Sequence, residues 1–267
     1  MNRSTGAEVY RLPGHGKLGG HRTVEFSTDS SRFASWGDDM HLRVWDVRTG
    51  KALLDVEIQP AGNEPADDDD DPFGPRGSFN MRRMMGLLSS DASWLLLRYY
   101  GSSYLFDAAT GKEIRKLPSE TRIETACFSP DGSKLLFARA ASAPTETKLQ
   151  DGRVRSSGPP SYEFVLMDLK DDSVLWKFQV DGVYGPMAFS PDRRVIAVST
   201  RRHFGDGDEV FFLDAPTGRK LATISDVHRI GWAMNGQRMA FSRDGRRFAA
   251  GLRDTTALVW RLSDLGL

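Results

Sequence analysis

The segment Phe26 to Lys51, FSTDSSRFASWGDDMHLRVWDVRTGK, decides the fold, because the rest of the chain repeats it in altered form. A polar turn at 27–31 separates two short apolar runs, and a Gly-Asp turn separates the second run from Leu42-Arg43-Val44-Trp45. This third run alternates with period two before the turn at Thr49-Gly50, as strands in succession do. With a further strand after that turn, the segment predicts a unit of four short strands.

Four more copies of this unit follow along the chain. The first turn recurs between apolar runs as Ser90-Asp91-Ala92-Ser93, Phe128-Ser129-Pro130-Asp131-Gly132, Phe189-Ser190-Pro191-Asp192-Arg193 and Phe241-Ser242-Arg243-Asp244-Gly245. The Trp45-Asp46 pair recurs as Phe106-Asp107, Met167-Asp168, Leu213-Asp214 and Trp260-Arg261, and the Thr-Gly turn as Thr110-Gly111 and Thr217-Gly218. Five copies of a four-stranded unit predict the blades of a propeller.

As a set, these motifs resemble the WD40-repeat propellers, and their bacterial members in particular, over nearly the whole chain. The resemblance implies an all-β, WD40-like β-propeller of about five four-stranded blades in a single domain, 1–267. In that family a His, a Ser or Thr, an Asp and a Trp form a hydrogen-bonded structural tetrad within a blade, and the matching residues here are His15, Ser35, Asp39 and Trp45. In the last copy Ala250 stands at the serine position, so that copy keeps only Asp254 and Trp260.

The two ends of the chain are complementary in the phase of the repeat. Residues 4–12 parallel 48–54 and therefore read as a fourth strand, whereas 246–262 supply three strands and stop where a fourth would begin. Pairing of 7–12 with 257–262 would remove an open sheet edge, so we expect residues 1–13 to close the propeller. Family members most often have seven blades, so the ring size stays open. A closed five-blade ring predicts a monomer, and any other arrangement predicts self-association.

The composition of the chain bears on its binding partners and on its location in the cell. The 267 residues include 36 basic and 36 acidic side chains, so the formal net charge is zero and no long-range field favours nucleic acid or anionic lipid. Residues 1–17 lack the apolar core of a signal peptide, and no later run approaches a membrane span, so a cytoplasmic protein is expected. The lone Cys127 permits no internal disulfide and is expected to be a buried, inert thiol.

Motifs that would carry catalysis, a cofactor or a metal are weak. The glycine pattern at 14–19 precedes a strand instead of a helix, so it predicts a connector and no dinucleotide site. The sequence has no nucleophile elbow, no helical His pair and no paired cysteines, and the aspartates that recur once per copy have a structural pattern. Five adjacent carboxylates at 67–71 lack the spacing of calcium ligands and predict a solvated acidic loop within 59–83. We therefore expect no catalytic residues, no cofactor and no metal.

Insertions occur on one side of the repeat. Those at 59–83, 141–161, 201–209 and 225–237 all follow the second or fourth strand of a copy, whereas every first and third turn is tight. Because successive strands run antiparallel, these insertions lie on one face. One-sided insertion commonly marks the binding side of a repeat protein, although surface loops also drift freely in length. The candidate contacts for a protein or peptide partner on this face are Phe73, Phe79, Arg153, Arg155, Arg202, Phe204 and Trp232.

These observations predict a non-catalytic protein-interaction scaffold. Two alternatives stay open. One is a propeller enzyme of the metal-dependent hydrolase or lactonase type, with its site at the mouth of the channel. The other is a fragment or domain of a larger signalling protein, because bacterial WD40 propellers often accompany kinase or other signalling domains.

Overall fold

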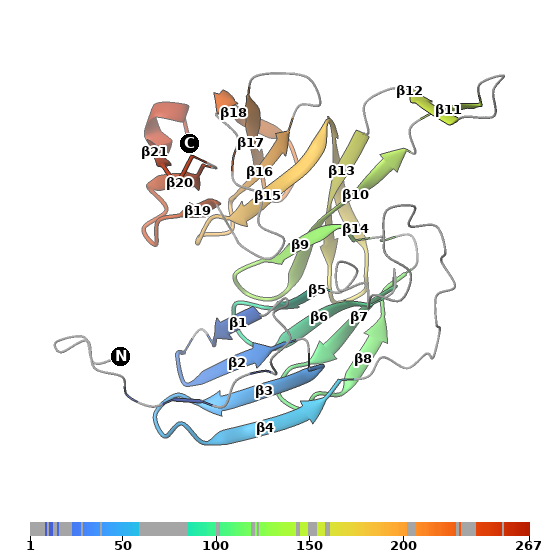
Figure 1. The fold of residues 1–267 in the computed structure, drawn as a ribbon. Helices are drawn as coiled ribbons and strands as arrows, with labels where there is room; N and C mark the ends of the chain where they lie inside the picture. The colour runs from blue at the N-terminus through green and yellow to red at the C-terminus, as the bar shows by residue number, and fades with distance from the viewer. Residues whose placement is uncertain are drawn as a thin grey trace. The chain divides into compact units, whose positions relative to one another are not determined.

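The structure is a computed structural model, and the regular elements of its described residues are β-strands and the short 3-10 helix η3 (Figure 1). The chain divides into two compact units, Met1–Ser119 and Glu120–Leu267, which are described separately. The structure describes residues 9, 11–12, 15, 23–27, 29–37, 39–58, 85–99, 102–118, 121, 123–142, 145–148, 154–157, 161–201, 207–227, 230, 239–252 and 254–267.

The first unit contains two antiparallel sheets, each a simple meander of four strands. Sheet 1 consists of β1 (Thr23–Phe26), β2 (Arg32–Trp36), β3 (His41–Asp46) and β4 (Ala52–Glu57), and sheet 2 consists of β5 (Met85–Leu88), β6 (Trp94–Tyr99), β7 (Ser102–Asp107) and β8 (Glu113–Lys116). One cluster of buried apolar side chains joins them, including Trp36 and Val44 of sheet 1 and Leu97 and Phe106 of sheet 2. Alternate residues of each strand therefore form the core between neighbouring sheets.

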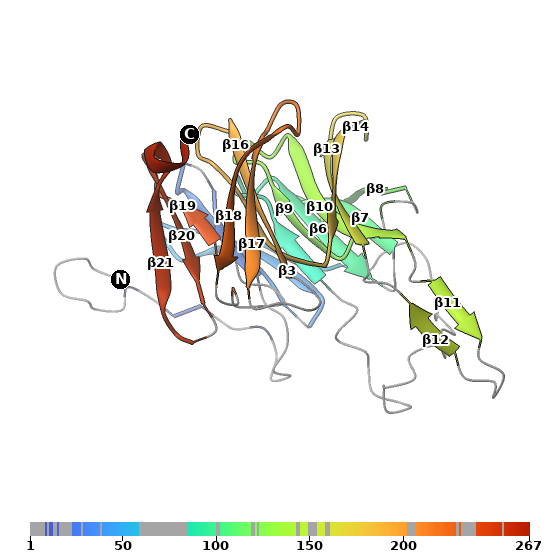
Figure 2. The ribbon, with the colours of Figure 1, turned by 90° about the horizontal axis from the view of Figure 1, so that it is seen from above.

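The second unit contains three more antiparallel sheets (Figure 2). Sheet 3 consists of β9 (Thr125–Phe128), β10 (Lys134–Ser142), β13 (Ser161–Asp168) and β14 (Val174–Asp181). Sheet 4 consists of β15 (Val183–Phe189), β16 (Val195–Arg201), β17 (Asp208–Asp214) and β18 (Lys220–Val227). Sheet 5 consists of β19 (Met239–Phe241), β20 (Arg247–Gly251) and β21 (Ala257–Arg261), followed by the helix η3 (Leu262–Leu265). A separate hairpin, β11 (Thr145–Lys148) with β12 (Val154–Ser157), lies between β10 and β13 in the sequence.

The predicted all-β class and the five-fold repeat of short antiparallel strands are confirmed in the described residues. Sheet 5 has three strands there, but β19 lies before residue 246, so 246–262 supplies two strands and not the three predicted. Ring closure by residues 7–12 stays a prediction, because Val9, Arg11 and Leu12 lie outside strands and 7, 8 and 10 lie outside the described residues. The single domain spanning 1–267 also stays a prediction.

The turn between the first two strands is built in the same way in all five sheets. In sheet 1 the hydroxyl of Ser27 donates to Oδ1 of Asp29 over 2.6 Å and accepts the backbone N–H of Arg32 over 2.9 Å. Hydrogen bonds from Ser27 and Ser31 lower the pKa of Asp29 to about 2. The same two bonds recur at the pairs Ser89 with Asp91, Ser129 with Asp131, Ser190 with Asp192 and Ser242 with Asp244.

The turn between the third and fourth strands has its own repeated geometry. In sheet 1 a carboxylate oxygen of Asp46 accepts both the backbone N–H and the hydroxyl of Thr49 over 2.7 Å, and Gly50 follows with a φ of 68°. Sheet 4 repeats both bonds at 214–218, and sheet 2 repeats the bond from the backbone N–H at 107–111, each with a glycine of positive φ at the end. In sheet 3 the glycine position is taken by Asp172, whose φ of 59° is also left-handed. Aspartate is one of the few residues other than glycine that adopt this conformation.

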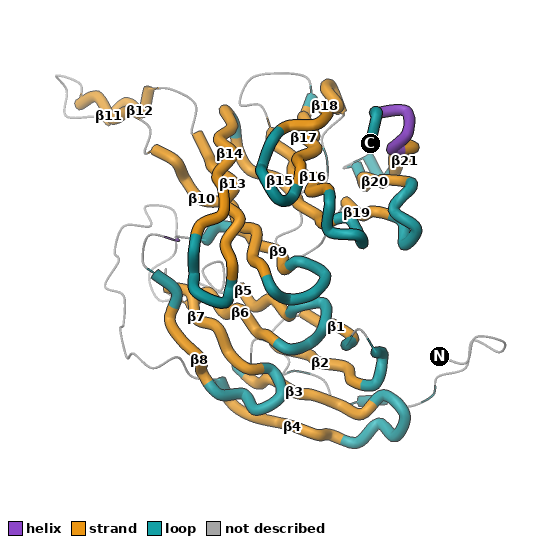
Figure 3. Tube along the Cα trace, turned by 180° about the vertical axis from the view of Figure 1, so that it is seen from behind, coloured by secondary structure: helices purple, strands orange, loops and turns teal. Residues whose placement is uncertain are grey.

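In each sheet, the connections at one end of the strands differ in length from those at the other end (Figure 3). Each described turn after a first or third strand spans five residues, as 27–31 does between β1 and β2. After second and fourth strands the length runs from Gly182 alone, between β14 and β15, to the whole of 58–84, between β4 and β5. In each sheet, all the variation in length therefore lies at the end of the strands where second and fourth strands finish, as the sequence predicts.

The predicted insertions differ from the structure in detail. The chain between second and third strands of sheet 4 is shorter than 201–209, because β16 runs through Arg201 and β17 begins at Asp208. Likewise β18 continues to Val227 within the predicted insertion 225–237, and 141–161 contains the hairpin of β11 and β12. The acidic segment 59–83 lies outside the described residues.

A third turn of one sheet packs on the fourth strand of the sheet before it. In the second unit the indole N–H of Trp176 donates to the carbonyl of Ala215 over 2.7 Å, and a Cβ on Gly218 would lie 2.6 Å from the Trp176 ring. In the first unit a Cβ on Gly111 would lie 2.2 Å from Cγ1 of Val56. Glycine is required at both turns for its positive φ and also for the absence of a side chain.

This contact predicts a difference between two glycines of equal conformation. Gly218 and Gly245 have φ values of +69° and +67°, but a Cβ at Gly245 would meet nothing within 4 Å. Gly245→Ala should therefore cost only the conformational strain of about 1–2 kcal/mol. Gly218→Ala should cost about 1–3 kcal/mol more, because it also displaces the Trp176 ring. Denaturant unfolding of both variants measures the difference, and equal losses would contradict the packing of this turn.

Candidate functional site

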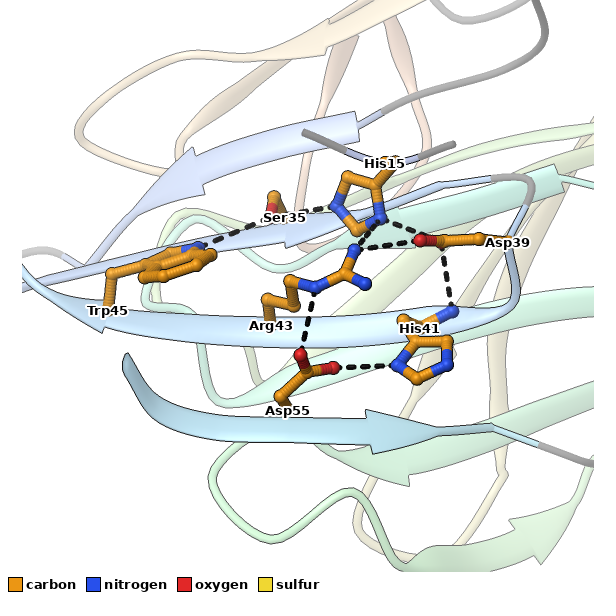
Figure 4. A network of polar contacts seen from close by, with 7 residues as sticks. All are labelled: His15, Ser35, Asp39, His41, Arg43, Trp45 and Asp55. Atoms are coloured by element: carbon orange, nitrogen blue, oxygen red, sulfur yellow. Dashed lines mark hydrogen bonds and ion pairs between the residues drawn. The ribbon is translucent and has the colours of Figure 1, made fainter. Parts of the chain in front are cut away.

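A polar network in sheet 1 brings together the four predicted tetrad residues (Figure 4). The indole Nε1 of the buried Trp45 lies 3.4 Å from Oγ of Ser35, which lies 2.9 Å from Nε2 of His15. The other ring nitrogen of His15, Nδ1, lies 2.7 Å from Oδ1 of Asp39. The side chains of His15 and Asp39 are 7% and 22% exposed, so this part of the network is largely shielded from water.

One tautomer of His15 satisfies the contacts that link Trp45, Ser35, His15 and Asp39. With the proton on Nδ1, His15 donates to Asp39 and its Nε2 accepts the hydroxyl proton of Ser35, which in turn accepts the indole N–H of Trp45. Nη1 of Arg43 lies 2.6 Å from the same Nδ1, and in this tautomer it donates instead to Oδ2 of Asp39 over 2.8 Å. Each link from Trp45 to Asp39 then pairs a donor with an acceptor, as a buried polar network requires.

Three residues that sequence reasoning did not find extend this network across the sheet. Nε of Arg43 donates to Oδ2 of Asp55 over 3.1 Å, and Nδ1 of His41 lies 2.6 Å from Oδ1 of the same carboxylate. Ser35, Arg43 and Asp55 are direct neighbours in the register of β2, β3 and β4. Period-two alternation places Arg43 and His41 on the face of Trp45, but only the strand register identifies Asp55 as their partner.

The charges in this network hold one another ionised. Partial burial opposes the charge on Asp39, but hydrogen bonds from His15 and Arg43 outweigh it and hold the pKa of Asp39 well below its usual range. A hydrogen bond from His41, and then one from Arg43, lower the pKa of Asp55. Partial burial likewise opposes the charge on Arg43, and its bonds to Asp39 and Asp55 raise its pKa. The lowered pKa values favour the ionised form of both carboxylates, whose ion pairs join neighbouring strands.

Six of the seven predicted partner-binding residues lie outside the described residues: Phe73, Phe79, Arg153, Arg202, Phe204 and Trp232. Arg155 belongs to β12, where it faces Thr147 of β11 in the strand register.

Other predicted features fall on described residues. Cys127 is buried, and desolvation raises the pKa of its thiol far above the usual range. Across the part of the chain that the structure describes, no three His, Cys, Asp or Glu side chains gather as metal ligands would. Among the same residues, no helix has the length and apolar character needed to span a membrane.

Comparison with known families gives a match that covers most of sheet 1. The family model described as WD domain, G-beta repeat matches residues 6–46, a range that contains His15, Ser35, Asp39 and Trp45. This chain carries a WD40 repeat at these residues, which supports a WD40-repeat family. The match ends with β3, at Asp46.

The later sheets keep the Ser-Asp turn but not the serine of the tetrad. The residue eight positions after the turn serine is Ser35 in sheet 1, and it is Leu97, Phe137, Val198 and Ala250 in sheets 2 to 5. These four side chains are at most 1% exposed. Apolar packing therefore replaces the hydrogen-bonded network, an exchange that stability tolerates well.

The network predicts the cost of removing Asp39. Asp39→Ala leaves His15 and Arg43 without their shared acceptor and should lower the free energy of unfolding by about 1–3 kcal/mol. Asp55→Ala is the matched control, because that side chain is 48% exposed and its ion pairs should contribute less than about 1 kcal/mol. An unchanged denaturation midpoint for Asp39→Ala would contradict the role of the network.

The contribution of Asp39 to the free energy of unfolding should decrease as the pH falls. Because folding lowers the pKa of Asp39 from its ordinary value of 3.8, its contribution is present above that pH and is lost as the pH falls toward the folded pKa. The stability difference between wild type and Asp39→Ala should therefore stay constant near neutral pH and shrink in acid.

Proposed function

We propose that this protein is a non-catalytic scaffold that binds a protein or peptide through its variable-loop face. We define this face by the connections that follow second and fourth strands, which leave from one end of the strands in each sheet. One observation carries the proposal: within each sheet, the five-residue turns lie at one end of the strands, and the longer connections leave from the other end. WD40 domains generally act in protein interaction, which supports the same class of function.

The opposite end of the strands, which carries the five-residue turns and which we call the turn edge, has the features of a structural element. Its serine, threonine and aspartate side chains are engaged in the repeated internal hydrogen bonds, as at Ser27 with Asp29 and at Thr49 with Asp46. Groups already bonded within the protein offer little to a partner. Uniform length also allows little variation in shape.

The variable-loop face has the features of a recognition surface. A rigid scaffold that displays loops of different length is a common way to build a binding site. The candidate contacts Phe73, Phe79, Phe204 and Trp232, together with Arg153, Arg155 and Arg202, are of the aromatic and arginine types that dominate binding energy at protein interfaces. A net charge of zero gives no electrostatic preference for phosphate backbones, which supports a protein or peptide partner.

Affinity capture with matched variants tests this proposal. One variant replaces 59–83 and 141–161 by short glycine-serine linkers, and the control reverses two exposed charges at the turn edge, Arg48→Glu with Arg219→Glu. The loop variant should lose the partners bound by wild type, and the turn variant should keep them, with both retaining the wild-type unfolding transition. Retention of all partners by the folded loop variant, or their loss from the turn variant, would overturn the assignment of the binding face.

The alternative of a metal-dependent enzyme is tested separately. Elemental analysis of the purified protein should find no stoichiometric metal. One tightly bound equivalent would favour the hydrolase or lactonase alternative over a scaffold.

A further inference from the structure

The interface between sheets 3 and 4 changes from apolar to polar at the variable-loop face. Its interior is a cluster of buried apolar side chains that includes Leu166 of sheet 3 and Val198 of sheet 4. Gly182 alone connects β14 to β15, with a φ of 123°, so the two sheets are held close together at this end. Both sheets belong to the second unit, so this interface does not involve residues 1–119.

Two tyrosines stand at the polar end of this interface. Tyr162 of β13 and Tyr184 of β15 pack against the apolar cluster, and their rings meet edge to face with centroids 4.9 Å apart. Both residues are only partly buried. An edge-to-face contact occupies one face of one ring, so part of the pair remains accessible at the variable-loop face.

Sheet 4 continues the polar surface across three strands. Tyr184, Thr200 and Glu209 are direct neighbours in the register of β15, β16 and β17. Thr200 lies on the same side of β16 as Val198, which belongs to the cluster between sheets 3 and 4. Glu209 stands in the same relation to Phe211 in β17. The tyrosine pair therefore lies beside a hydroxyl and a carboxylate.

Thr200 carries a hydrogen-bonding group that the fold does not satisfy. The residue is 1% exposed, and its Oγ1 has no hydrogen-bond partner among the described residues. The neighbouring Ser199 differs in this respect, because its hydroxyl donates to the carbonyl of Pro186 over 3.0 Å. A buried hydroxyl without a partner is destabilising, so Thr200 points to a site that a ligand completes.

The charge at this surface is negative. Burial, and then the charge of Glu124, raise the pKa of the Tyr162 hydroxyl. Glu124 directly precedes β9 in sheet 3, and Glu209 lies on the facing side in sheet 4. Arg201 follows Thr200 in β16, so alternation directs it to the opposite face of sheet 4. Aromatic rings together with carboxylates favour a cationic ligand.

We call Tyr162, Tyr184, Thr200 and Glu209 the tyrosine site. Resting on the proposed function, in which a protein or peptide binds the variable-loop face, we propose that the tyrosine site receives a lysine or arginine side chain of that partner. The cation lies over a tyrosine ring, Glu209 balances its charge, and the hydroxyl of Thr200 accepts one of its N–H groups. Lysine and arginine share the two features that this site requires, a positive charge and several N–H donors.

Titration with small amides tests the site without the natural partner. The chemical shifts of isotope-labelled tyrosine rings are followed as N-acetyl-arginine amide or N-acetyl-lysine amide is added, and Tyr162→Phe and Tyr184→Phe assign the two signals. Both cations should move these signals to saturation. N-acetyl-citrulline amide, which has the shape of the arginine compound without its charge, should leave them in place. If neither cation moves the signals, or if citrulline moves them equally, the proposal is wrong.

Substitutions separate the contributions of the ring and the charge, with binding of the arginine amide followed at the signal of Tyr162. Tyr184→Phe keeps the ring and should bind like wild type, whereas Tyr184→Leu should weaken binding about tenfold. Glu209→Gln should also weaken it. The matched control Glu113→Gln alters a partly buried carboxylate in sheet 2 and should not. Equal binding by folded Tyr184→Leu and Tyr184→Phe, or an equal effect of the two glutamines, would contradict the proposal.

Affinity capture distinguishes the tyrosine site from the scaffold function itself. Tyr184→Leu should lose partners that wild type captures, and Tyr184→Phe and Glu113→Gln should keep them. If Tyr184→Leu keeps every partner while the loop variant loses them, the scaffold function stands and the tyrosine site is wrong. If wild type captures no partner, the scaffold function fails, and titration with the small amides still decides whether the site binds a cation.

Discussion

Each sheet of this protein depends on one serine hydroxyl that serves two partners at the first turn. Ser27 donates to Asp29 and accepts the N–H of Arg32, the first residue of the second strand. The bond to Asp29 fixes the path of the turn, and the bond to Arg32 fixes where the ladder between the two strands begins. Because the pairing of neighbouring strands sets which side chains face the core, one local hydrogen-bond pattern also determines the packing between sheets.

The five sheets reach a packed interior by two chemical routes. Sheet 1 uses the network of His15, Ser35 and Asp39, whose members need one another because each would be costly to bury alone. At the serine position the other sheets have apolar residues, which pack without any requirement for partners. The family match covers the first copy, where the polar network stands, whereas the repeated turns extend through the whole array.

The features that sequence predicted best are those formed by residues close in the chain. The Ser-Asp and Thr-Gly turns are local, so their copies revealed the number of repeats and the side on which the insertions fall. The partnership of Arg43 with Asp55 was missed, because it depends on the register between β3 and β4. Strand ends were also missed: Arg201 and Val227 continue their strands by cross-strand hydrogen bonding where the local sequence is polar or mixed.

The central claim is that one turn, repeated five times, organises the whole chain. Hydrogen exchange at the five amides that donate to a turn serine tests it directly, and these belong to Arg32, Trp94, Lys134, Val195 and Arg247. All five should exchange slowly, at rates set by opening of a whole sheet, because each amide is held at the start of a strand ladder. Exchange of any one of them at the rate of an unfolded peptide would show that its sheet is not built on this turn and would contradict the account.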